Sequence, residues 1–297
     1  MATNNTIDLH MHSNNSDGKK SVEELFQQIK DLGLGVFSLT DHDNCDGNAE
    51  MAALVRGNDI RFISGIEFSC LMDGSDPETD CHILGYDFDI RHPEIERLKK
   101  KSLEFRQKKL DDLCDFLRKE GYVDLSSQEI DEMRLNKNVG KNDVHARMVE
   151  HGVGSSQECW SILDKFKSNQ HPEAREAIDA IKAAGGVAVW AHPLGDKENR
   201  KDRDAEDVFR EKLDVMQSLG IEGLECCYAK FEEDEIAMLM DAARKRGLHI
   251  TGGSDYHGKV DKKTDEYIVL PGTTGASRNH SDEIRPFVNF IFSRQPS

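Results

Sequence analysis

Residues 7–43 read IDLHMHSNNSDGKKSVEELFQQIKDLGLGVFSLTDHD. Two short apolar runs, Ile7–His12 and Val36–Asp41, enclose a segment that begins at Ser21 and ends at Gly33. A serine followed three residues later by glutamate is typical of a helix start, and a glycine is typical of a helix end. The stretch therefore predicts a strand, a helix and a second strand, with polar side chains where each strand ends.

The same alternation continues along most of the chain. Short apolar runs separated by amphipathic stretches of helical period indicate parallel strands joined by crossover helices. Seven strands are predicted, and they span Ile7–His12, Val36–Asp41, Arg61–Phe68, His82–Phe88, Gly186–Ala191, Gly223–Cys227 and His249–Gly253. The fold class is therefore α/β, with the strands arranged as a barrel.

One segment interrupts the alternation, because only helical patterns occur between Pro93 and Pro172. These patterns cover Ile95–Gly121, Asn142–Gly152 and Ser155–Asn169. We expect residues 94–171 to form an all-helical insertion that caps the mouth of the barrel, while residues 1–93 and 172–297 form the barrel itself. A helical bundle packed on the side of the barrel is the alternative.

Composition and charge restrict the function. The chain has 297 residues and a formal net charge of −17, which argues against a protein that coats long nucleic acid, since that binding relies on lysine and arginine. Apolar runs remain well below the ~18 residues of a membrane span, and the amino terminus lacks a secretory signal. The seven cysteines lack CxxC spacing and indicate reduced thiols. We expect a cytoplasmic protein with a small substrate and no membrane partner.

Imidazole and carboxylate groups gather at the predicted strand ends. His10 and His12 point to one face of their strand, because neighbouring side chains alternate. Glu67 interrupts an apolar strand, and a buried carboxylate is costly unless a cation accompanies it. Asp255 and His257 follow the last strand. Active sites of such barrels are assembled from the ends of several strands, so these side chains predict a shared metal site.

The sequence resembles the polymerase and histidinol phosphatase (PHP) superfamily of phosphoesterases. The motifs that carry the resemblance are Asp8–Ser13, Thr40–Asp43, Gly65–Glu67, Gly185–Pro193 and Gly252–His257. It is most similar to the stand-alone branch that contains 3′,5′-nucleotide bisphosphate phosphatases and the RNase AM (TrpH-like) enzymes. The resemblance implies a distorted seven-stranded β/α barrel of the PHP type.

The resemblance also implies a metal-ligand set. The nine ligands it implies are His10, His12, Asp17, His42, Glu67, His82, His192, Asp255 and His257. In the implied grouping, one ion is held by His10, His12, Glu67 and Asp255, a second by Glu67, His82 and His192, and a third by Asp17, His42 and His257. Mixed nitrogen and oxygen ligands suit two or three divalent ions of manganese, iron or zinc.

The predicted mechanism is that of a metal-dependent phosphoric ester hydrolase. Two ions that share Glu67 could also share a water, lower its pKa and direct the resulting hydroxide at phosphorus. Asp255 is the candidate for accepting the proton of that water. Asp255, Glu67 and His192 are therefore the predicted catalytic residues.

Substrate binding is assigned to the insertion, where the sequence departs from its relatives. Many of them carry Gly-Arg-Pro-His before an Ala-Arg pair, whereas this chain has a stretch that begins Gly140-Lys141-Asn142 and continues to Arg147. Lysine lacks the bidentate fork of arginine, so we expect a substrate that differs from the bisphosphate nucleotides of that branch. Lys141, Asn142 and Arg147 are the predicted substrate-binding residues. For Arg147, pairing with acids on neighbouring helices is the alternative.

Several functions remain open at this point. The leading one is hydrolysis of a small phosphorylated substrate, such as a nucleoside mono- or bisphosphate, a sugar phosphate or a cyclic phosphate ester. The alternatives are 5′-3′ exoribonuclease activity that trims an oligonucleotide, histidinol phosphate phosphatase activity, and a non-catalytic metal-binding regulatory domain.

Overall fold

The sheet is a single, nearly closed barrel of seven strands. The computed structural model describes residues 5–72, 80–136, 138–168, 170–195, 205–261, 264 and 266–294. The strands follow chain order in the sheet: β1 (Ile7–Asp8), β2 (Val36–Leu39), β3 (Arg61–Leu71), β4 (Asp80–Tyr86), β5 (Val187–Trp190), β6 (Gly223–Tyr228) and β7 (His249–Gly253). Beyond β1 the chain bonds along β7, because the Leu9 N–H donates to the Gly252 carbonyl and Met11 bridges to Tyr256. The predicted fold class is thereby confirmed.

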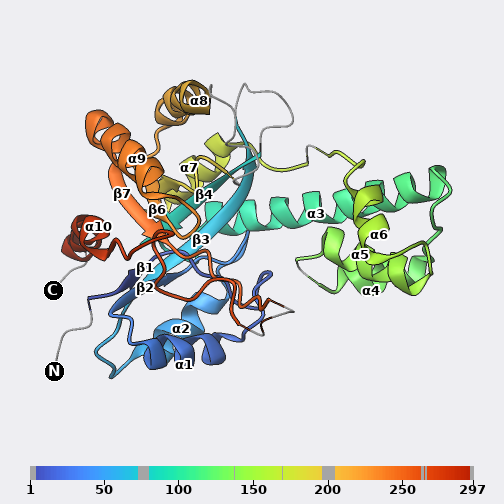
Figure 1. Cartoon of the computed structure of the whole chain (residues 1–297), viewed down its shortest axis with the longest axis horizontal. Coiled ribbons are helices and arrows are strands. Elements are labelled where there is room, and N and C mark those ends of the chain that lie inside the picture. The colour runs from blue at the N-terminus through green and yellow to red at the C-terminus, as the bar shows by residue number, and fades with distance from the viewer. Residues whose placement is uncertain are drawn as a thin grey trace.

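Helices cover the outside of this barrel (Figure 1). They are α1 (Val22–Leu32), α2 (Gly47–Val55), α7 (Ala174–Ala183), α8 (Ala205–Leu219), α9 (Glu233–Arg246) and α10 (Ser281–Arg294). Helix α1 begins and ends as predicted: the Ser21 side chain accepts the Glu24 N–H, the Glu24 carboxylate accepts the Ser21 N–H, and Gly33 has a φ of 71°. The apolar faces of these helices pack on buried strand residues, so the core lies between sheet and helices.

Strand β4 differs from the prediction because it runs antiparallel to both of its neighbours. Parallel strands need a crossover connection of about a dozen residues or more, usually a helix. The chain between Leu71 and Asp80 is too short for one, and β3 and β4 therefore pair as a hairpin. This reversal has a functional consequence, because the beginning of β4 lies at the edge where β2 and β3 end.

The segment between β4 and β5 contains four helices before α7. These are α3 (Pro93–Lys119), α4 (Ser127–Arg134), α5 (Lys141–Glu150) and α6 (Ser156–Leu163). Helix α4 was not predicted, and its weak signal has a reason: only Met133 is buried on it. The last predicted helix ends at Leu163, short of its predicted end.

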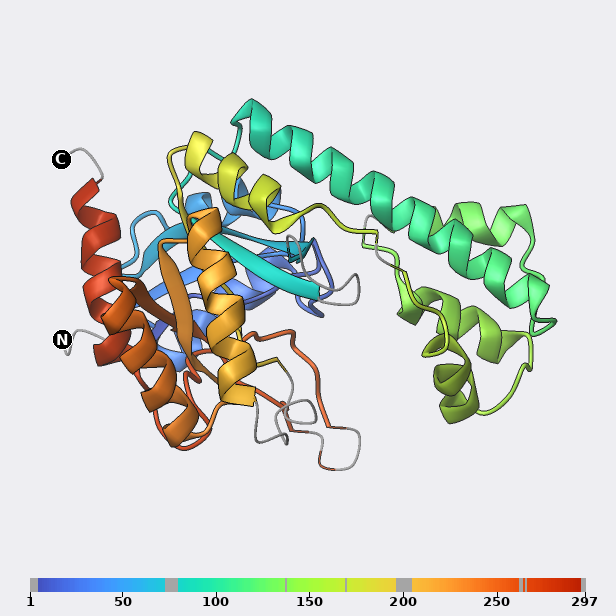
Figure 2. The ribbon, with the colours of Figure 1, turned by 90° about the horizontal axis from the view of Figure 1, so that it is seen from above.

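The helical insertion has a hydrophobic cluster of its own. Leu110, Leu113 and Leu117 of α3 pack with residues of α5 and α6, such as Met148 and Leu163. In Figures 1 and 2, α3 leads away from the barrel and α4–α6 gather at its far end. The division of the chain at residues 94 and 171, and a cap over the mouth, stay predictions. Among helices of the described residues, none combines the length and apolar composition that a membrane span requires.

Candidate metal centre

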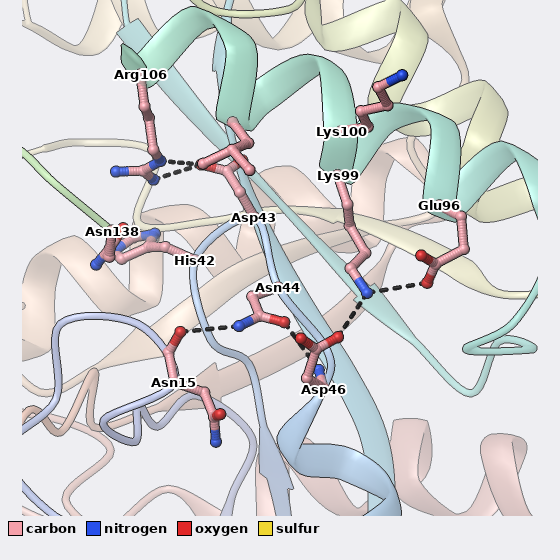
Figure 3. A pocket seen from close by; sticks show the side chains of 11 residues that line it. Asn15, His42, Asp43, Asn44, Asp46, Glu96, Lys99, Lys100, Arg106 and Asn138 are labelled. Atoms are coloured by element: carbon pink, nitrogen blue, oxygen red, sulfur yellow. Dashed lines mark hydrogen bonds and ion pairs between the residues drawn. The ribbon is translucent and has the colours of Figure 1, made fainter. Parts of the chain in front are cut away.

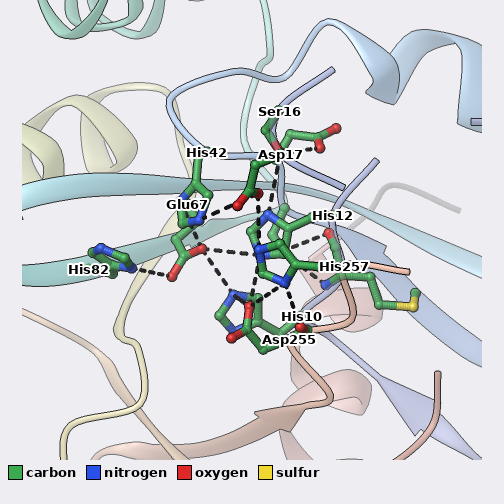
Figure 4. Close-up of polar contacts among 12 residues, drawn as sticks. His10, His12, Ser16, Asp17, His42, Glu67, His82, Asp255 and His257 are labelled. Atoms are coloured by element: carbon green, nitrogen blue, oxygen red, sulfur yellow. Dashed lines mark hydrogen bonds and ion pairs between the residues drawn. The ribbon is translucent and has the colours of Figure 1, made fainter. Parts of the chain in front are cut away.

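The nine predicted ligands come from the ends of six strands and from one loop, and they meet at one edge of the barrel. Figure 4 labels all of them except His192. His10 and His12 follow β1, His42 follows β2, Glu67 lies on β3, His82 lies near the start of β4, His192 follows β5, Asp255 and His257 follow β7, and Asp17 lies in the loop before α1. Because β4 is reversed, its first residues face the carboxyl ends of the other strands. That is how His82, opposite Ser69 in the sheet, joins the group.

The first group of ligands is fully or largely buried. His10 Nε2 lies 3.1 Å from Glu67 Oε2 and 3.5 Å from Asp255 Oδ1. His12 Nε2 lies 3.3 Å and 3.1 Å from the same two oxygens. The structure therefore brings together the four side chains expected around one ion, and their candidate ligand atoms lie within 4.8 Å of one another.

Glu67 extends this group to a second position. Its Oε1 lies 2.8 Å from His82 Nδ1 and 3.1 Å from His192 Nε2, while its Oε2 lies 3.1 Å from His42 Nδ1. One carboxylate therefore faces imidazoles on both of its oxygens. This is the geometry that a bridging ligand between two cations requires.

A third group surrounds Asp17. Its Oδ1 lies 3.0 Å from His257 Nε2 and 3.9 Å from His42 Nε2. His12 also belongs to this group, since its ring centroid lies 4.2 Å from that of His257 and 4.5 Å from that of His42. The expected third set contained only Asp17, His42 and His257, so the addition of His12 comes from the structure.

Buried atoms without hydrogen bonds show that these residues fit a cation. Within the described residues, five buried ligand atoms form no hydrogen bond: His10 Nε2, His12 Nε2, Asp17 Oδ1, His42 Nδ1 and Glu67 Oε2. An unsatisfied buried polar atom costs ~1–3 kcal/mol, and here the atoms converge on each other. Divalent ions held within the three groups would satisfy these atoms. Their nitrogen and oxygen donors suit manganese, iron or zinc.

The pKa values of the cluster reflect strong coupling between acids and imidazoles. Burial by itself raises the pKa of Glu67, but the charges of His10 and His42 outweigh it and hold that pKa well below its usual range. Burial lowers the pKa of His12, but the close Asp255 and Glu67 carboxylates raise it to about 10. The buried carboxylates are thus stable only with positive charge beside them. Protons on the imidazoles and bound metal ions compete for this role.

A buried carboxylate outside the predicted set supports two of the ligands. Glu225 of β6 is fully buried, and its Oε1 lies 2.9 Å from His10 Nδ1. Its Oε2 accepts the His192 backbone N–H at 2.7 Å. A carboxylate that bonds to a ligating histidine without binding the ion fixes the tautomer and orientation of that histidine. The sequence contained a usable signal outside the predicted set, because Glu225 interrupts an apolar strand as Glu67 does.

A second missed carboxylate organises the loop that carries Asp17. Asp41 is buried and accepts the Ser13 N–H, the Ser13 hydroxyl and the Ser16 hydroxyl, each at 2.7 Å. Backbone strain also concentrates at this edge, since His192 and Asp255 have positive φ values of 24° and 54°. Such conformations persist only where the surroundings impose them, and they are common at functional sites.

A pocket of about 260 Å³ adjoins the cluster on the side of the insertion (Figure 3). His42 and the residues after it form one wall, and α3 forms the other with Glu96, Lys99 and Arg106. The Arg106 guanidinium bonds to the Asp43 carboxylate, which links α3 to the loop of His42. Asn138 is the only residue beyond α3 that lines it from the described part of the insertion.

The predicted substrate-binding residues lie on α5. Lys141 is the first residue of α5, and its Nζ lies 3.6 Å from Asp164 Oδ1. Asn142 is exposed beside it. Arg147 bonds to Glu132 and Glu150 at 2.8 Å and 3.0 Å, which agrees with the alternative interpretation of that residue. A contact of any of the three with substrate stays a prediction.

A barrel with clustered imidazoles and carboxylates at its mouth defines a class of metal-dependent hydrolases. Comparison with known proteins narrows the class: the PHP domain model matches residues 8–188, and the chain belongs to the PHP family.

Three relatives match most of the chain. A 5′-3′ exoribonuclease of Haemophilus influenzae is 30% identical over 84% of this chain and 89% of its own length. A 3′,5′-nucleoside bisphosphate phosphatase of Chromobacterium violaceum is 25% identical over 96% and 95%. A phosphoribosyl 1,2-cyclic phosphate 1,2-diphosphodiesterase of Eggerthella lenta is 26% identical over 86% and 95%.

A solved structure shares the fold. It is an amidohydrolase from Chromobacterium violaceum with bound sulfate and no metal, 24% identical, with a TM-score of 0.71 over 97% of this chain and 96% of that one. Family, relatives and fold together confirm the predicted class, a metal-dependent phosphoesterase that hydrolyses phosphoric esters.

Proposed function

We propose that the chain hydrolyses a phosphate ester of a small phosphorylated substrate, such as a nucleoside mono- or bisphosphate, a sugar phosphate or a cyclic phosphate ester. The observation that carries this proposal is the position of Glu67, whose two oxygens face imidazoles on both sides at 2.8–3.3 Å. Two neighbouring cation sites of this kind suit the transfer of a phosphoryl group to water.

We propose the ligand sets that the family resemblance implies. His10, His12, Glu67 and Asp255 would hold one ion, Glu67 with His82 and His192 a second, and Asp17 with His42 and His257 a third. The groups of side chains support the first set, add His12 to the third and bring His42 beside Glu67 and His82, while His192 Nε2 lies 3.1 Å from Glu67 Oε1. Bound divalent ions supply Lewis acidity, offset charge on the phosphoryl oxygens and lower the pKa of water. We infer manganese or iron in the cell, with two or three ions per chain. Metal analysis of the purified protein by mass spectrometry tests both the identity and the number.

The chain's own residues then orient water and substrate. Asp255 is partly accessible, its Oδ1 faces His10 and His12, and its Oδ2 accepts the Tyr228 hydroxyl at 2.9 Å. We propose that Tyr228 holds this carboxylate in place and that Asp255 accepts a proton from the attacking water. The phosphorus–oxygen ester bond breaks as the new one forms. The exposed edges of His82 and His192 mark the side from which the substrate enters.

Lys141, Asn142 and Arg147 are proposed to contact the substrate from the insertion. Lys141 is the least engaged of the two basic residues, because within the described part of the chain it has one long ion pair, whereas Arg147 has two short ones. We also infer that the protein works in a reducing compartment such as the cytoplasm, since the seven cysteines are buried and lack CxxC spacing.

A second candidate function is removal of nucleotides from an RNA end. The exoribonuclease relative, at 30% identity, favours it. The net charge of −17 disfavours a long nucleic acid, although it permits a short one. Phosphate or nucleotide release from monoesters, bisphosphates, cyclic esters and 5′-phosphorylated short RNAs, each with manganese, separates the candidates. Turnover of none of these compounds by metal-loaded protein would overturn the proposal.

A further inference from the structure

Two of the seven cysteines lie directly opposite each other in the β3–β4 hairpin. Cys70 of β3 and Cys81 of β4 are partners in the antiparallel register. Side chains of directly opposed residues point to the same face of the sheet, with Cβ atoms about 4.5–5.5 Å apart. Both cysteines also belong to the same buried apolar cluster, with exposed fractions of 1% and 6%. The two sulfur atoms therefore lie on one face of the hairpin, inside one packed layer.

The backbone geometry of this pair suits a disulfide. The N–H of the neighbouring Ser69 donates to Asp43 Oδ1 at 3.1 Å, on the side of β2, and therefore points away from β4. Because successive N–H groups along a strand point in opposite directions, Cys70 directs its N–H and its carbonyl toward Cys81. The Cα atoms of such a hydrogen-bonded pair lie ~5.5 Å apart, which is within the ~4.4–6.8 Å that disulfides require. No change of register is needed for the two sulfur atoms to bond.

The inner face of the same hairpin end carries ligands of the metal centre (Figure 4). His82 follows Cys81 directly and points to the opposite face, because side chains alternate along a strand. Its Nδ1 lies 2.8 Å from Oε1 of Glu67, which lies three residues before Cys70 on β3. The two cysteines and the two ligands therefore occupy opposite faces of one short stretch of paired strand. The separation of the strands at the cysteines sets the position of His82 relative to Glu67.

A disulfide would alter that separation. The Cβ atoms of a disulfide lie ~3.5–4.5 Å apart, which is about 1 Å closer than the Cβ atoms of an opposed pair. The strands must approach or twist by a similar amount at Cys70 and Cys81 when the bond forms. Metal coordination distances tolerate deviations of only about 0.2 Å. A shift of this size at the residue before His82 is therefore enough to weaken the binding of an ion shared by His82 and Glu67.

We propose that Cys70 and Cys81 are a modification site, at which a reversible disulfide weakens metal binding on the inner face of the hairpin. Formation of the bond does not depend on the proposed function, whereas its effect on the ion rests on the proposed metal centre. Disulfides in reducing compartments are usually transient and either catalytic or redox-sensing. The pair thus makes the metal content of the protein sensitive to oxidation.

The oxidant is a low-molecular-weight disulfide. Cys81 reacts first, because it is the more exposed of the two and lies next to the exposed Asp80 at the end of the hairpin. Its thiolate attacks one sulfur of the oxidant, forms a mixed disulfide and releases one thiol, and the Cys70 sulfur then displaces the second thiol. One S–S bond breaks and one S–S bond forms in total. The two cysteines lose two electrons and two protons, which end on the two released thiol molecules.

The first test is whether the bond forms in the folded protein. The whole protein is treated with oxidised glutathione, the remaining thiols are alkylated after unfolding, and the peptides are identified by mass spectrometry. We expect peptides linked through Cys70 and Cys81, whereas Cys226 and Cys227, fully buried on β6, should be alkylated. Treatment with a thiol reductant should restore both thiols. No linkage, or linkage only in urea-unfolded protein, would overturn the modification site.

The second test measures the effect on the metal centre. Metal-free protein, reduced or oxidised, is titrated with Mn²⁺ in competition with a chromophoric chelator. We expect the oxidised protein to bind one ion about 10-fold more weakly, the lower end of the effect of disturbing the support of a metal ligand. Reduction should restore the affinity. Cys81→Ala should not respond to oxidised glutathione, whereas the matched control Cys159→Ala, which removes a buried cysteine of the insertion, should respond as the wild type does.

The outcomes keep this inference separate from the proposed function. Equal Mn²⁺ affinity of the reduced and oxidised protein, or the same response to oxidised glutathione in Cys81→Ala and the wild type, would overturn the effect on the metal centre. Circular dichroism checks that each variant is folded, and Cys70→Ala, which removes the other half of the pair, replaces Cys81→Ala if that variant does not fold. If the reduced, metal-loaded protein hydrolyses no phosphate ester although the disulfide forms and lowers the Mn²⁺ affinity, the proposed function fails and this inference stands.

Discussion

Replacing Glu225 by glutamine should weaken metal binding without removing any ligand. The carboxylate is fully buried and serves two ligands at once, His10 through Nδ1 at 2.9 Å and His192 through its backbone N–H at 2.7 Å. Glutamine keeps the shape and one acceptor oxygen. Its NH₂ group, however, is a donor and faces either the imidazole N–H or the peptide N–H. One of the two hydrogen bonds is therefore lost in Glu225→Gln.

The magnitude follows from that single lost bond. A hydrogen bond to a charged group contributes ~1.5–3 kcal/mol. Loss of an outer partner of a metal ligand typically lowers metal affinity by about 10- to 100-fold, which corresponds to about 1.4–2.7 kcal/mol. The two estimates overlap, so we expect the affinity for the ion held by His10 to fall by about one to two orders of magnitude.

The assay is titration of metal-free protein with Mn²⁺ in competition with a chromophoric chelator. Glu211→Gln is the matched control, because it makes the same chemical change on an exposed residue of α8. Circular dichroism checks that both variants are folded. If Glu225→Gln binds Mn²⁺ as tightly as the wild type and turns over substrate at the same rate, Glu225 does not support the ligands His10 and His192.

Three further predictions concern the centre and its link to the insertion. Glu67→Gln should remove the shared carboxylate and reduce bound metal below two ions per chain, with a fall in turnover of at least about 100-fold; full metal content would contradict the bridging geometry. Metal removal by a chelator should lower the melting temperature by several degrees, since an ion present at ~100 times its Kd stabilises the folded protein by about 2.7 kcal/mol. An unchanged calorimetric scan would argue against a resident ion. Arg106→Gln should leave the nearly buried Asp43 carboxylate without its guanidinium and lower the free energy of unfolding by about 1–3 kcal/mol, and an unchanged urea midpoint would show that this pair contributes little.

Local sequence signals were sufficient to predict most strands and helices of the barrel. Helix α1 begins and ends where its capping serine and its glycine predicted, because caps act within a few residues of sequence. His10 and His12 lie on one face because alternation is a property of a single strand. The ligand set came from the family resemblance, and the structure brings all nine side chains to one edge.

Only the tertiary structure decided the direction of β4. The predicted strands, ending at Phe68 and starting at His82, leave enough residues for a crossover, whereas the observed β3 and β4 extend to Leu71 and from Asp80 and leave too few. It also decided the partners of Glu225, because Glu225 lies 215 residues from His10. Periodicity and capping describe neighbours along the chain, whereas these contacts arise when separate strands and helices pack. The sequence alone thus determined most of the elements, α4 excepted, and which side chains face the mouth, and packing determined how those side chains are supported.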